Sequence, residues 1–418
     1  MVKKRKILFI HDTLFLTPDA NARLVFRLIN YLQDNFTVDI SLLGRANNAE
    51  EYVDQYKGCK LIHEPHIRVI ECQKLKEKLG RWGWLRYILK PRTLVYRIRN
   101  NVEPYVIEAS KWLRQHIVEY DVVIATCSPY YPLLLASEVS KYCPVIFYKI
   151  DAMATFPIPQ CPNKDTYLAT IENEITFDAC ASKIITTDVI FKYYNQLPTR
   201  VNSHKVLLLN YPNVVRRNLS NNTNVIVNSF SKKNINICFI GKFYLDIRNP
   251  QYLLNLMKLL NDWQVVLHII GNIGDCEAMI NTHLLKKTSN IVYHGTVSPT
   301  DVDDVMLQTD ILVHVGNSID TCMPSKILDY ISSGKPILNI CKIPSCPTLP
   351  LMARYPLGLT IYEYEELTEN VISKVAKFCY DNKGKQISFA TINELYYDST
   401  IEYVGQKFYE VVESVIKK

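Results

Sequence analysis

The feature that most constrains the fold is a repeated alternation of short apolar runs with helical periodicity. Residues 6–12, KILFIHD, are typical of a buried strand, residues 21–33 repeat apolar side chains as a helix does, and residues 36–44 are strand-like again. The alternation continues to residue 188. Because strands that alternate with helices usually pair in parallel, this pattern predicts an α/β fold with a doubly wound parallel sheet.

The alternation stops and then starts again, which predicts a second domain. Residues 209–234 are rich in Asn and Ser and have little apolar periodicity, so we interpret them as an interdomain connection. A chain of 418 residues also exceeds what one hydrophobic core usually serves. The predicted division is an N-terminal domain at 1–208, the connection at 209–234, a second domain at 235–394, and a C-terminal helix at 395–418 that packs back toward the N-terminal domain.

Composition limits the class of protein. With 48% hydrophobic and 21% charged residues the chain has a globular composition, and no apolar run approaches the ~18 residues that span a bilayer. The start MVKKRKILFIHD has too short an apolar stretch for a signal peptide, so a cytoplasmic location is predicted. The twelve cysteines form no C-x-x-C pair and have no His partner at zinc spacing, which indicates reduced thiols and no metal site.

The positive charge is concentrated in one segment. The net charge is +7, and residues 74–99 contain nine Lys or Arg against one acid, Glu77. Trp82 and Trp84 lie among these cations, a mixture expected of an element on an anionic membrane surface, such as the inner face of the membrane. A solvated basic loop and helix is the alternative interpretation. Nucleic-acid binding is not predicted, because nothing else in the chain resembles a recognition module.

Three predicted strands of the second domain end in glycine, at Gly241, Gly271 and Gly295. Ligands of open parallel sheets bind at the carboxyl ends of the strands, where glycine lets the backbone approach a phosphate closely. The first predicted strand-to-helix turn, HDTLFLTPDAN, has no glycine, which argues against a dinucleotide-binding turn and an NAD-dependent enzyme. The sequence therefore predicts a nucleotide site in the second domain.

The stretch MPSKILDYISSGKP predicts a short helix with a polar and an apolar arc. Pro324 suits the first helical position and Gly334 the C-terminal end, which places Ser325 and Lys326 in the first turn. Unpaired N–H groups and the positive end of the helix dipole favour an anion there, most naturally a phosphate. Alternatively, Lys326 and Asp329 form an exposed ion pair. The polar arc comprises Ser325, Lys326, Asp329, Ser332 and Ser333; the core-facing arc comprises Ile327, Leu328 and Ile331.

These features together resemble GT-B glycosyltransferases, specifically the bacterial relatives of glycosyltransferase family 4. The likeness is sharpest in FIGKFYLDIRNPQYLL, HIIGNIG, NIVYHGTVSPTDVDDVMLQTDILVHVGN and MPSKILDYISSGKPIL, in this order. It implies a GT-B architecture, with two Rossmann-like domains whose doubly wound sheets face a central cleft. It also implies retaining transfer of a sugar from a nucleotide-diphosphate donor to a hydroxyl of a glycan or lipid-linked acceptor, in bacterial surface polysaccharide or glycoconjugate synthesis. No cofactor is expected besides this donor substrate.

The resemblance implies roles for individual residues of the second domain. The donor pyrophosphate would lie against Gly241 and Lys242, and Asp329 would bind the nucleotide ribose. The family has an acid at the position of Thr321, so Asp320 is the candidate catalytic substitute next to it. The implied donor-binding residues are Gly241, Lys242, Arg248, Gly271, Asn272, Ser325, Lys326 and Asp329.

In the N-terminal domain the resemblance makes Asp151 a catalytic or acceptor-binding carboxylate; a capping or hinge carboxylate is the alternative. Asp12, Asn21 and Ser128 are acceptor-side candidates. The D-x-D run at residues 301–303 lies in a predicted surface helix and gives metal dependence no support. Two further interpretations remain: a GT-B-shaped sugar-nucleotide epimerase, and a catalytically silent scaffold of a polysaccharide assembly complex.

Overall fold

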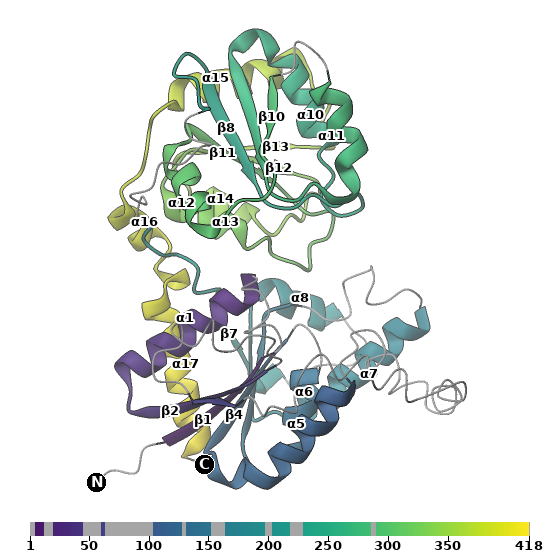
Figure 1. The fold of residues 1–418 in the computed structure, drawn as a ribbon, viewed down its shortest axis with the longest axis vertical. Coiled ribbons are helices and arrows are strands. Elements are labelled where there is room, and N and C mark those ends of the chain that lie inside the picture. Colours follow the sequence, from purple (N-terminus) through teal and green to yellow (C-terminus); the bar gives the residue numbers. More distant parts are fainter. Residues whose placement is uncertain are drawn as a thin grey trace. The chain divides into compact units, whose positions relative to one another are not determined.

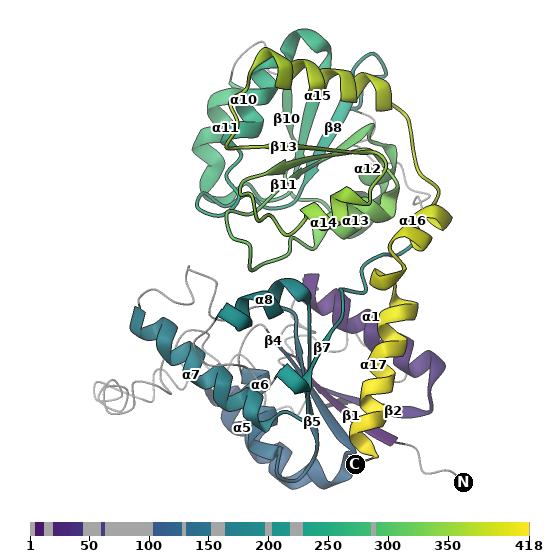
Figure 2. The same cartoon turned by 180° about the vertical axis from the view of Figure 1, so that it is seen from behind.

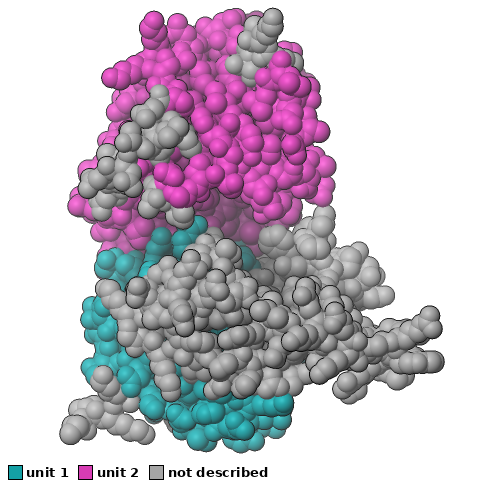
Figure 3. Space-filling model, viewed as in Figure 1, with its two compact units in different colours: residues 1–212, 401–418 teal, residues 213–400 magenta. Residues whose placement is uncertain are grey.

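The computed structural model describes residues 5–11, 20–44, 60–62, 103–127, 131–151, 164–196, 203–217, 229–285 and 290–417. The chain divides into two compact units (Figure 3). Unit 1 comprises Met1–Pro212 and Ile401–Lys418, and unit 2 comprises Asn213–Thr400. The sequence predicted a first domain at 1–208, a connection at 209–234 and a second domain at 235–394, whereas unit 2 already begins at Asn213.

Unit 1 is built on a seven-stranded parallel sheet with the order β3-β2-β1-β4-β5-β6-β7 (Figure 1). Its strands are β1 (Arg5–Ile10), β2 (Val38–Leu43), β3 (Lys60–Ile62), β4 (Val122–Cys127), β5 (Val145–Lys149), β6 (Lys183–Thr186) and β7 (Val206–Leu208). Its helices are α1 (Ala20–Asn35), α5 (Glu103–His116), α6 (Tyr131–Val139), α7 (Lys164–Cys180), α8 (Asp188–Gln196) and α17 (Ile401–Ile416).

Both faces of this sheet are covered by helices. One hydrophobic core joins alternate residues of β1, β4 and β5 to α5, α6 and α7. On the other face lie α1, whose apolar stripe from Leu24 to Leu32 is fully buried, and α17. A central parallel strand buried on both sides reads as a continuous apolar run, which is why KILFI was recognisable from sequence.

The C-terminal helix α17 belongs to unit 1, although unit 2 precedes it in the chain. It lies beside α1 in both views (Figures 1 and 2). Tyr409 stacks on Phe36 with the ring centroids 3.4 Å apart, and a Cβ on Gly405 would lie 2.3 Å from Tyr31. Glycine at position 405 therefore permits the two helices to approach closely.

Unit 2 is built on a six-stranded parallel sheet with the order β10-β9-β8-β11-β12-β13 (Figure 1). Its strands are β8 (Ile235–Ile240), β9 (Val265–Ile270), β10 (Ile291–Tyr293), β11 (Ile311–Val315), β12 (Ile337–Cys341) and β13 (Gly358–Tyr362). Its helices are α10 (Gln251–Leu259), α11 (Glu277–Leu284), α12 (Pro299–Gln308), α13 (Lys326–Ser333), α14 (Leu349–Ala353), α15 (Glu369–Asn382) and α16 (Phe389–Leu395).

Helices again cover both faces of the sheet in unit 2. The large core packs α10, α11 and α15 against one face, while α12 and α13 lie on the other (Figures 1 and 2). The predicted α/β class with two doubly wound parallel sheets is therefore confirmed. Strands β3, β7 and β13 were not predicted; each is the terminal strand of its sheet, and the first two have only 3 residues.

The basic segment 74–99 lies outside the described residues. Within the part of the chain that the structure describes, no helix combines the length and apolar character needed to cross a bilayer. The nine cysteines in that part are free thiols.

Candidate functional site

The sheet of unit 2 has its topological switch point between β8 and β11. From β8 the chain proceeds outward to β9 and β10, and from β11 it proceeds to β12 and β13 on the other side. Open parallel sheets bind ligands outside the carboxyl ends of the two strands that flank this point. In this chain those ends carry Gly241 after β8 and Gly316 with Asn317 after β11. The topology therefore selects this edge as the candidate site.

Glycine follows each of the strands β8, β9 and β10, and the structural reason for it differs from one position to the next. Gly241 and Gly271 extend the ladder, since their N–H groups donate to Ile270 O at 2.9 Å and to Gly295 O at 2.7 Å. Gly271 has a φ of 123°, and a Cβ there would lie 2.0 Å from Gly241 O. Close approach of two backbones thus explains Gly271 without any ligand. A Cβ on Gly295 would have no atom within 4 Å, but its φ of 71° is one that residues with a Cβ rarely adopt.

Two predicted cations follow β8. Arg248 donates from Nη2 and Nε to Oδ1 of Asn317 at 2.7 and 3.1 Å, and from Nη1 to Lys242 O at 3.4 Å. Burial lowers the pKa of Arg248 from its ordinary value. Lys242 is exposed, and its Nζ lies 4.6 Å from the ring centroid of Tyr244. Arg248 is thus oriented by the loop after β11, whereas Lys242 is accessible to an anion.

Two other predicted residues occupy exposed loops. Asn272 accepts a hydrogen bond at Oδ1 from Gly274 N at 2.7 Å, so it shapes the turn after β9. Asp320 accepts one from Ser345 Oγ at 3.1 Å. Next to it, Oγ1 of Thr321 is buried and has no hydrogen-bond partner among the described residues. The polar partner that the described residues give Asp320 is therefore a loop serine.

Helix α13 forms from the stretch predicted to be helical. Gly334, with a φ of 71°, ends it, as predicted, whereas Ser325 is its N-cap residue and not part of its first turn. The helix begins at Lys326 rather than at Pro324, because Ile327 N and Leu328 N donate to carbonyls only three residues back, at 3.1 and 3.2 Å. This tight turn is not α-helical and precedes the first regular turn.

Part of the polar arc of α13 packs against other segments of unit 2, and only Ser325 and Lys326 of the arc are not buried. Every residue from Ile327 to Ser333 is buried. Ser332 Oγ accepts from Val215 N at 3.3 Å, and its one hydrogen is shared between Leu328 O at 2.7 Å and Asn213 O at 3.2 Å. Ser333 Oγ donates to Tyr330 O at 2.6 Å. The residues that follow Pro212 cover this arc, which helical periodicity within 326–333 could not reveal.

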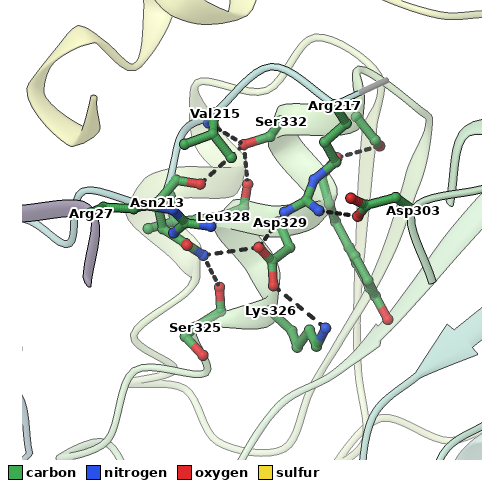
Figure 4. A network of polar contacts seen from close by, with 12 residues as sticks. Arg27, Asn213, Val215, Arg217, Asp303, Ser325, Lys326, Leu328, Asp329 and Ser332 are labelled. Atoms are coloured by element: carbon green, nitrogen blue, oxygen red, sulfur yellow. Dashed lines mark hydrogen bonds and ion pairs between the residues drawn. The ribbon is translucent and has the colours of Figure 1, made fainter. Parts of the chain in front are cut away.

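Asp329 lies at the centre of a polar network (Figure 4). Its Oδ1 accepts from Nδ2 of Asn213 at 3.1 Å and from Arg217, and its Oδ2 lies 3.5 Å from Nζ of Lys326. Arg217 also contacts Asp303 of α12. The Lys326–Asp329 pair considered from the sequence is therefore present. Asn213 and Arg217 were missed, because they fall in the stretch interpreted as a connection.

The tyrosine of α13 brings the helix to the glycine edge of the sheet. Its hydroxyl, on Tyr330, bonds both Ile240 N at 2.9 Å and Ile240 O at 3.1 Å, and Gly241 is the next residue. The middle of α13 and the end of β8 are thereby tied to one another. The structure therefore places two of the predicted donor segments together, although 90 residues separate Ile240 from Tyr330.

Unit 1 carries its own polar cluster at the carboxyl ends of β4 and β5. Asp151 is partly buried and accepts at Oδ2 from Nδ2 of Asn21 at 2.7 Å, while its carbonyl accepts from the Cys127 thiol at 3.3 Å. Two predicted residues are thus in direct contact. Asp12 and Ser128 lie outside the described residues.

Next to this cluster is a buried charged triad. Lys149 Nζ lies 3.2 Å from Glu174 Oε1 and 2.6 Å from Asp178 Oδ1, and all three side chains are at most 4% exposed. Burial raises the pKa of Glu174 to about 7, although Lys149 opposes the shift. Burial likewise raises the pKa of Asp178. The triad joins α7 to β5.

The D-x-D run lies in α12, as predicted, and its two carboxylates have separate structural partners. Asp301 Oδ2 accepts from the Ser298 hydroxyl at 2.7 Å, and Asp303 pairs with Arg217. Within the described ranges, no group of three His, Cys, Asp or Glu side chains is arranged to hold a metal ion.

Comparison with protein families matches residues 234–347 to a model described as "Glycosyl transferases group 1". This range contains the glycine edge, Arg248 and α13. Among curated proteins, no sequence matches the chain.

Solved structures share the fold over the whole chain at low sequence identity. Anabaena HepE, solved with UDP and glucose, is 14% identical with a TM-score of 0.59, covering 98% of this chain and 100% of its own. Sucrose-phosphate synthase from Thermosynechococcus elongatus is 11% identical with a TM-score of 0.67, covering 99% and 100%. UDP-GlcNAc 2-epimerase from Methanocaldococcus jannaschii is 11% identical with a TM-score of 0.57, covering 98% and 99%. The GT-B fold predicted from the sequence is confirmed.

Proposed function

We propose that this chain, a GT-B glycosyltransferase, moves a sugar from a nucleotide-diphosphate donor to an acceptor hydroxyl with retention of configuration. One observation carries the proposal. The segment that matches group 1 glycosyltransferases, residues 234–347, contains the switch point of its sheet, and there the Tyr330 hydroxyl ties α13 to Ile240, the residue before Gly241. We propose that the diphosphate binds at this edge, where the positive end of the α13 dipole and the cations Lys242, Arg248 and Lys326 would attract it.

The proposed chemistry follows from the charges that develop in transfer. Breaking the anomeric C–O bond gives the sugar oxocarbenium character and adds negative charge to the leaving diphosphate. Lys242, Arg248 and Lys326 are the cations offered to that diphosphate in unit 2. Fixed cations and N–H groups stabilise such a charge without having to reorganise during the reaction. The proposed leaving-group stabilisation therefore needs no metal ion.

In unit 1 we assign the acceptor role to Asp151, which Asn21 orients through the 2.7 Å hydrogen bond. The carboxylate would accept a hydrogen bond from the acceptor hydroxyl or take its proton. Asp320 is the proposed substitute for the acid that the family has at position 321, because it lies next to Thr321 on the loop before α13.

The proposed setting is the cytoplasmic face of a bacterial membrane, in surface polysaccharide or glycoconjugate synthesis. The concentration of nine cations in residues 74–99 favours an anionic lipid surface, and hence a lipid-linked or membrane-proximal acceptor. The resemblance to bacterial family members also supports a role in surface polysaccharide or glycoconjugate synthesis.

The donor site is tested by four calorimetric affinities. Lys326→Ala should weaken binding of a nucleoside diphosphate at least about tenfold, because a charge-assisted contact to phosphate is worth about 1.5–3 kcal/mol. The same variant should affect the bare nucleoside far less. Asp329→Asn should weaken both ligands, since both retain the ribose. If both variants bind the diphosphate as the parent does, α13 is not the donor site.

A matched control is Lys377→Ala, which removes another helical lysine of unit 2 paired with an aspartate, at 2.6 Å from Asp381. This exposed pair is expected to contribute less than about 1 kcal/mol to stability and nothing to binding.

Slow release of nucleoside diphosphate from a sugar nucleotide would distinguish an enzyme from a catalytically silent scaffold. Interconversion of sugar epimers without an acceptor would instead indicate an epimerase.

A further inference from the structure

The first residues of unit 2 run along the polar side of α13. Val215 N donates to Ser332 Oγ at 3.3 Å, and the same hydroxyl donates to Asn213 O at 3.2 Å. Val214 N donates to Ser399 O at 3.0 Å, and Val214 forms a parallel bridge with Thr400. The segment 213–217 is therefore fixed at several points against the helix proposed to bind the donor.

Arg217 is the most connected cation of this segment. Its side chain is 9% exposed, and its two terminal nitrogens contact Asp303 of α12 and Asp329 of α13 (Figure 4). With Lys326 the group contains two cations and two carboxylates, so its charges balance. Removing one partner of such a buried group leaves a charge uncompensated, which is costly in a poorly solvated site.

The two cations on Asp329 are not equivalent. Lys326 is 25% exposed, lies at the start of the helix, and approaches Oδ2 at 3.5 Å. Arg217 is more buried and shares Oδ1 with Asn213 Nδ2, which also donates to Ser325 O at 3.2 Å. A phosphate at the start of α13 would therefore recruit Lys326 rather than Arg217, because the lysine is accessible and flexible.

We infer that Arg217, assisted by Asn213, is a positioning residue of the donor site that holds Asp329 while Lys326 moves to the phosphate. Arg217 compensates the negative charge of Asp329 through Oδ1. Lys326 can therefore move away without leaving a buried carboxylate unpaired. Oδ2 then becomes available to accept hydrogen bonds from the ribose hydroxyls. This inference rests on the proposed function, because it deepens the role given there to Lys326 and Asp329.

The inference is tested by a double-mutant cycle in binding. Parent, Arg217→Ala, Asp329→Asn and the double variant are titrated with UDP, GDP and ADP, and the diphosphate that binds the parent best is used throughout. Arg217→Ala should weaken its binding about tenfold in the parent and have almost no further effect beside Asp329→Asn, since residues acting through one another are non-additive. Equal effects in both backgrounds, or none in either, would overturn the inference.

Two conservative variants distinguish positioning from folding. Arg217→Lys keeps a cation but cannot bridge two carboxylates with a planar fork, so we expect an affinity between those of parent and Arg217→Ala. Asn213→Ala removes an uncharged donor that bonds both Asp329 Oδ1 and Ser325 O, and it should weaken binding by about threefold. These two variants carry the test if Arg217→Ala does not fold. Parent-like diphosphate binding by both of them would also overturn the inference.

The control variant is Arg354→Ala, which removes another arginine–aspartate pair of unit 2, with Nη1 3.2 Å from Asp398 Oδ2. It should bind the diphosphate as the parent does. If the parent binds none of the three diphosphates, the proposed function and this inference fail together. If Lys326→Ala weakens binding as expected and the Arg217 cycle is additive, this inference fails alone.

Discussion

At the scale of single residues, Gly271 illustrates how a backbone contact dictates a residue type. Its φ of 123° is one that side chains with a Cβ rarely adopt, and a Cβ would lie 2.0 Å from Gly241 O. The contact joins the ends of β8 and β9, where the donor pyrophosphate is proposed to lie. The glycine is thus required for the sheet edge itself, before any ligand is considered.

Gly271→Ala is therefore expected to destabilise unit 2 by on the order of 3 kcal/mol, from backbone strain together with overpacking. The measurement is the free energy of unfolding in denaturant. Gly384→Ala is the matched control, because Gly384 has a φ of 72° but a Cβ there would meet no atom within 4 Å. That variant should lose only about 1 kcal/mol. Equal losses would show that the contact with Gly241 contributes nothing.

The residue scale also shows why a carboxylate's role cannot be read from its own helix. From the sequence, Asp329 has Lys326 as its visible partner at i, i+3. The structure adds Arg217, which is 112 positions away in the chain. The contact between Asp329 and Arg217 cannot be predicted from either residue's own neighbours in the sequence. It depends on where the first segment of unit 2 crosses α13.

At the scale of elements, α7 is attached to β5 through buried charges. Lys149 stands between Glu174 and Asp178, and Oε2 of Glu174 has no hydrogen-bond partner among the described residues. The ammonium of Lys149 thus pairs with two carboxylates in a buried, poorly solvated environment. This arrangement explains why the pKa of Glu174 rises from its ordinary 4.5 to about 7 even beside a lysine.

The raised pKa predicts a pH dependence of stability. Between about pH 4.5 and 7 the folded chain holds the proton of Glu174 while the unfolded chain has released it. The folded state then binds more protons, so the free energy of unfolding falls as pH rises, by at most about 1.4 kcal/mol per pH unit for one proton. Glu174→Gln should remove this contribution and flatten the profile between pH 5 and 7.

The measurement is chemical denaturation at several pH values. Asp178 remains in the variant and its pKa is also raised by burial, so its own contribution to the fall with rising pH should persist. Glu172→Gln changes an exposed glutamate on the same helix and should keep the slope of the parent. Identical slopes in the parent and Glu174→Gln would mean that Glu174 is ionised throughout this range.

At the scale of the whole molecule, the distribution of charge suggests a lipid-facing segment. The net charge is +7, and residues 74–99 contribute nine cations and one acid, so the rest of the chain is nearly neutral. These residues lie outside the described part of the chain. The prediction therefore rests on composition and not on a surface seen in the structure.

Binding to acidic vesicles should weaken steeply with salt, because the Debye length falls from roughly 30 Å at 0.01 M to 3 Å at 1 M ionic strength. Replacing Lys74, Lys76 and Lys78 together by Gln should weaken this binding by about 3 kcal/mol, or ~1 per cation. Replacing the exposed Lys258, Lys374 and Lys377 of unit 2 together is the control and should leave it unchanged. Equal binding of the parent to neutral and acidic vesicles would contradict the prediction.

Much of the architecture could be predicted because each signal was local. A buried parallel strand can be recognised from a short, largely apolar run, and INICFI is such a run for β8. The end of α13 depends on one residue, Gly334, which has a left-handed φ of 71°. Strands β3 and β7 escaped prediction because 3 residues carry too little periodicity, and β13 because only one of its five residues is buried.

The sequence by itself determined two parallel sheets, a glycine edge and a short helix ending at Gly334. Only the tertiary structure decided what the polar arc of α13 contacts. Segment 213–217 covers it, so Ser332 and Ser333 serve the fold, and Arg217 shares Asp329 with Lys326. The physical reason is that strand and helix formation depend on near neighbours in the chain, whereas the partner of a buried charge is chosen by whichever distant segment packs against it.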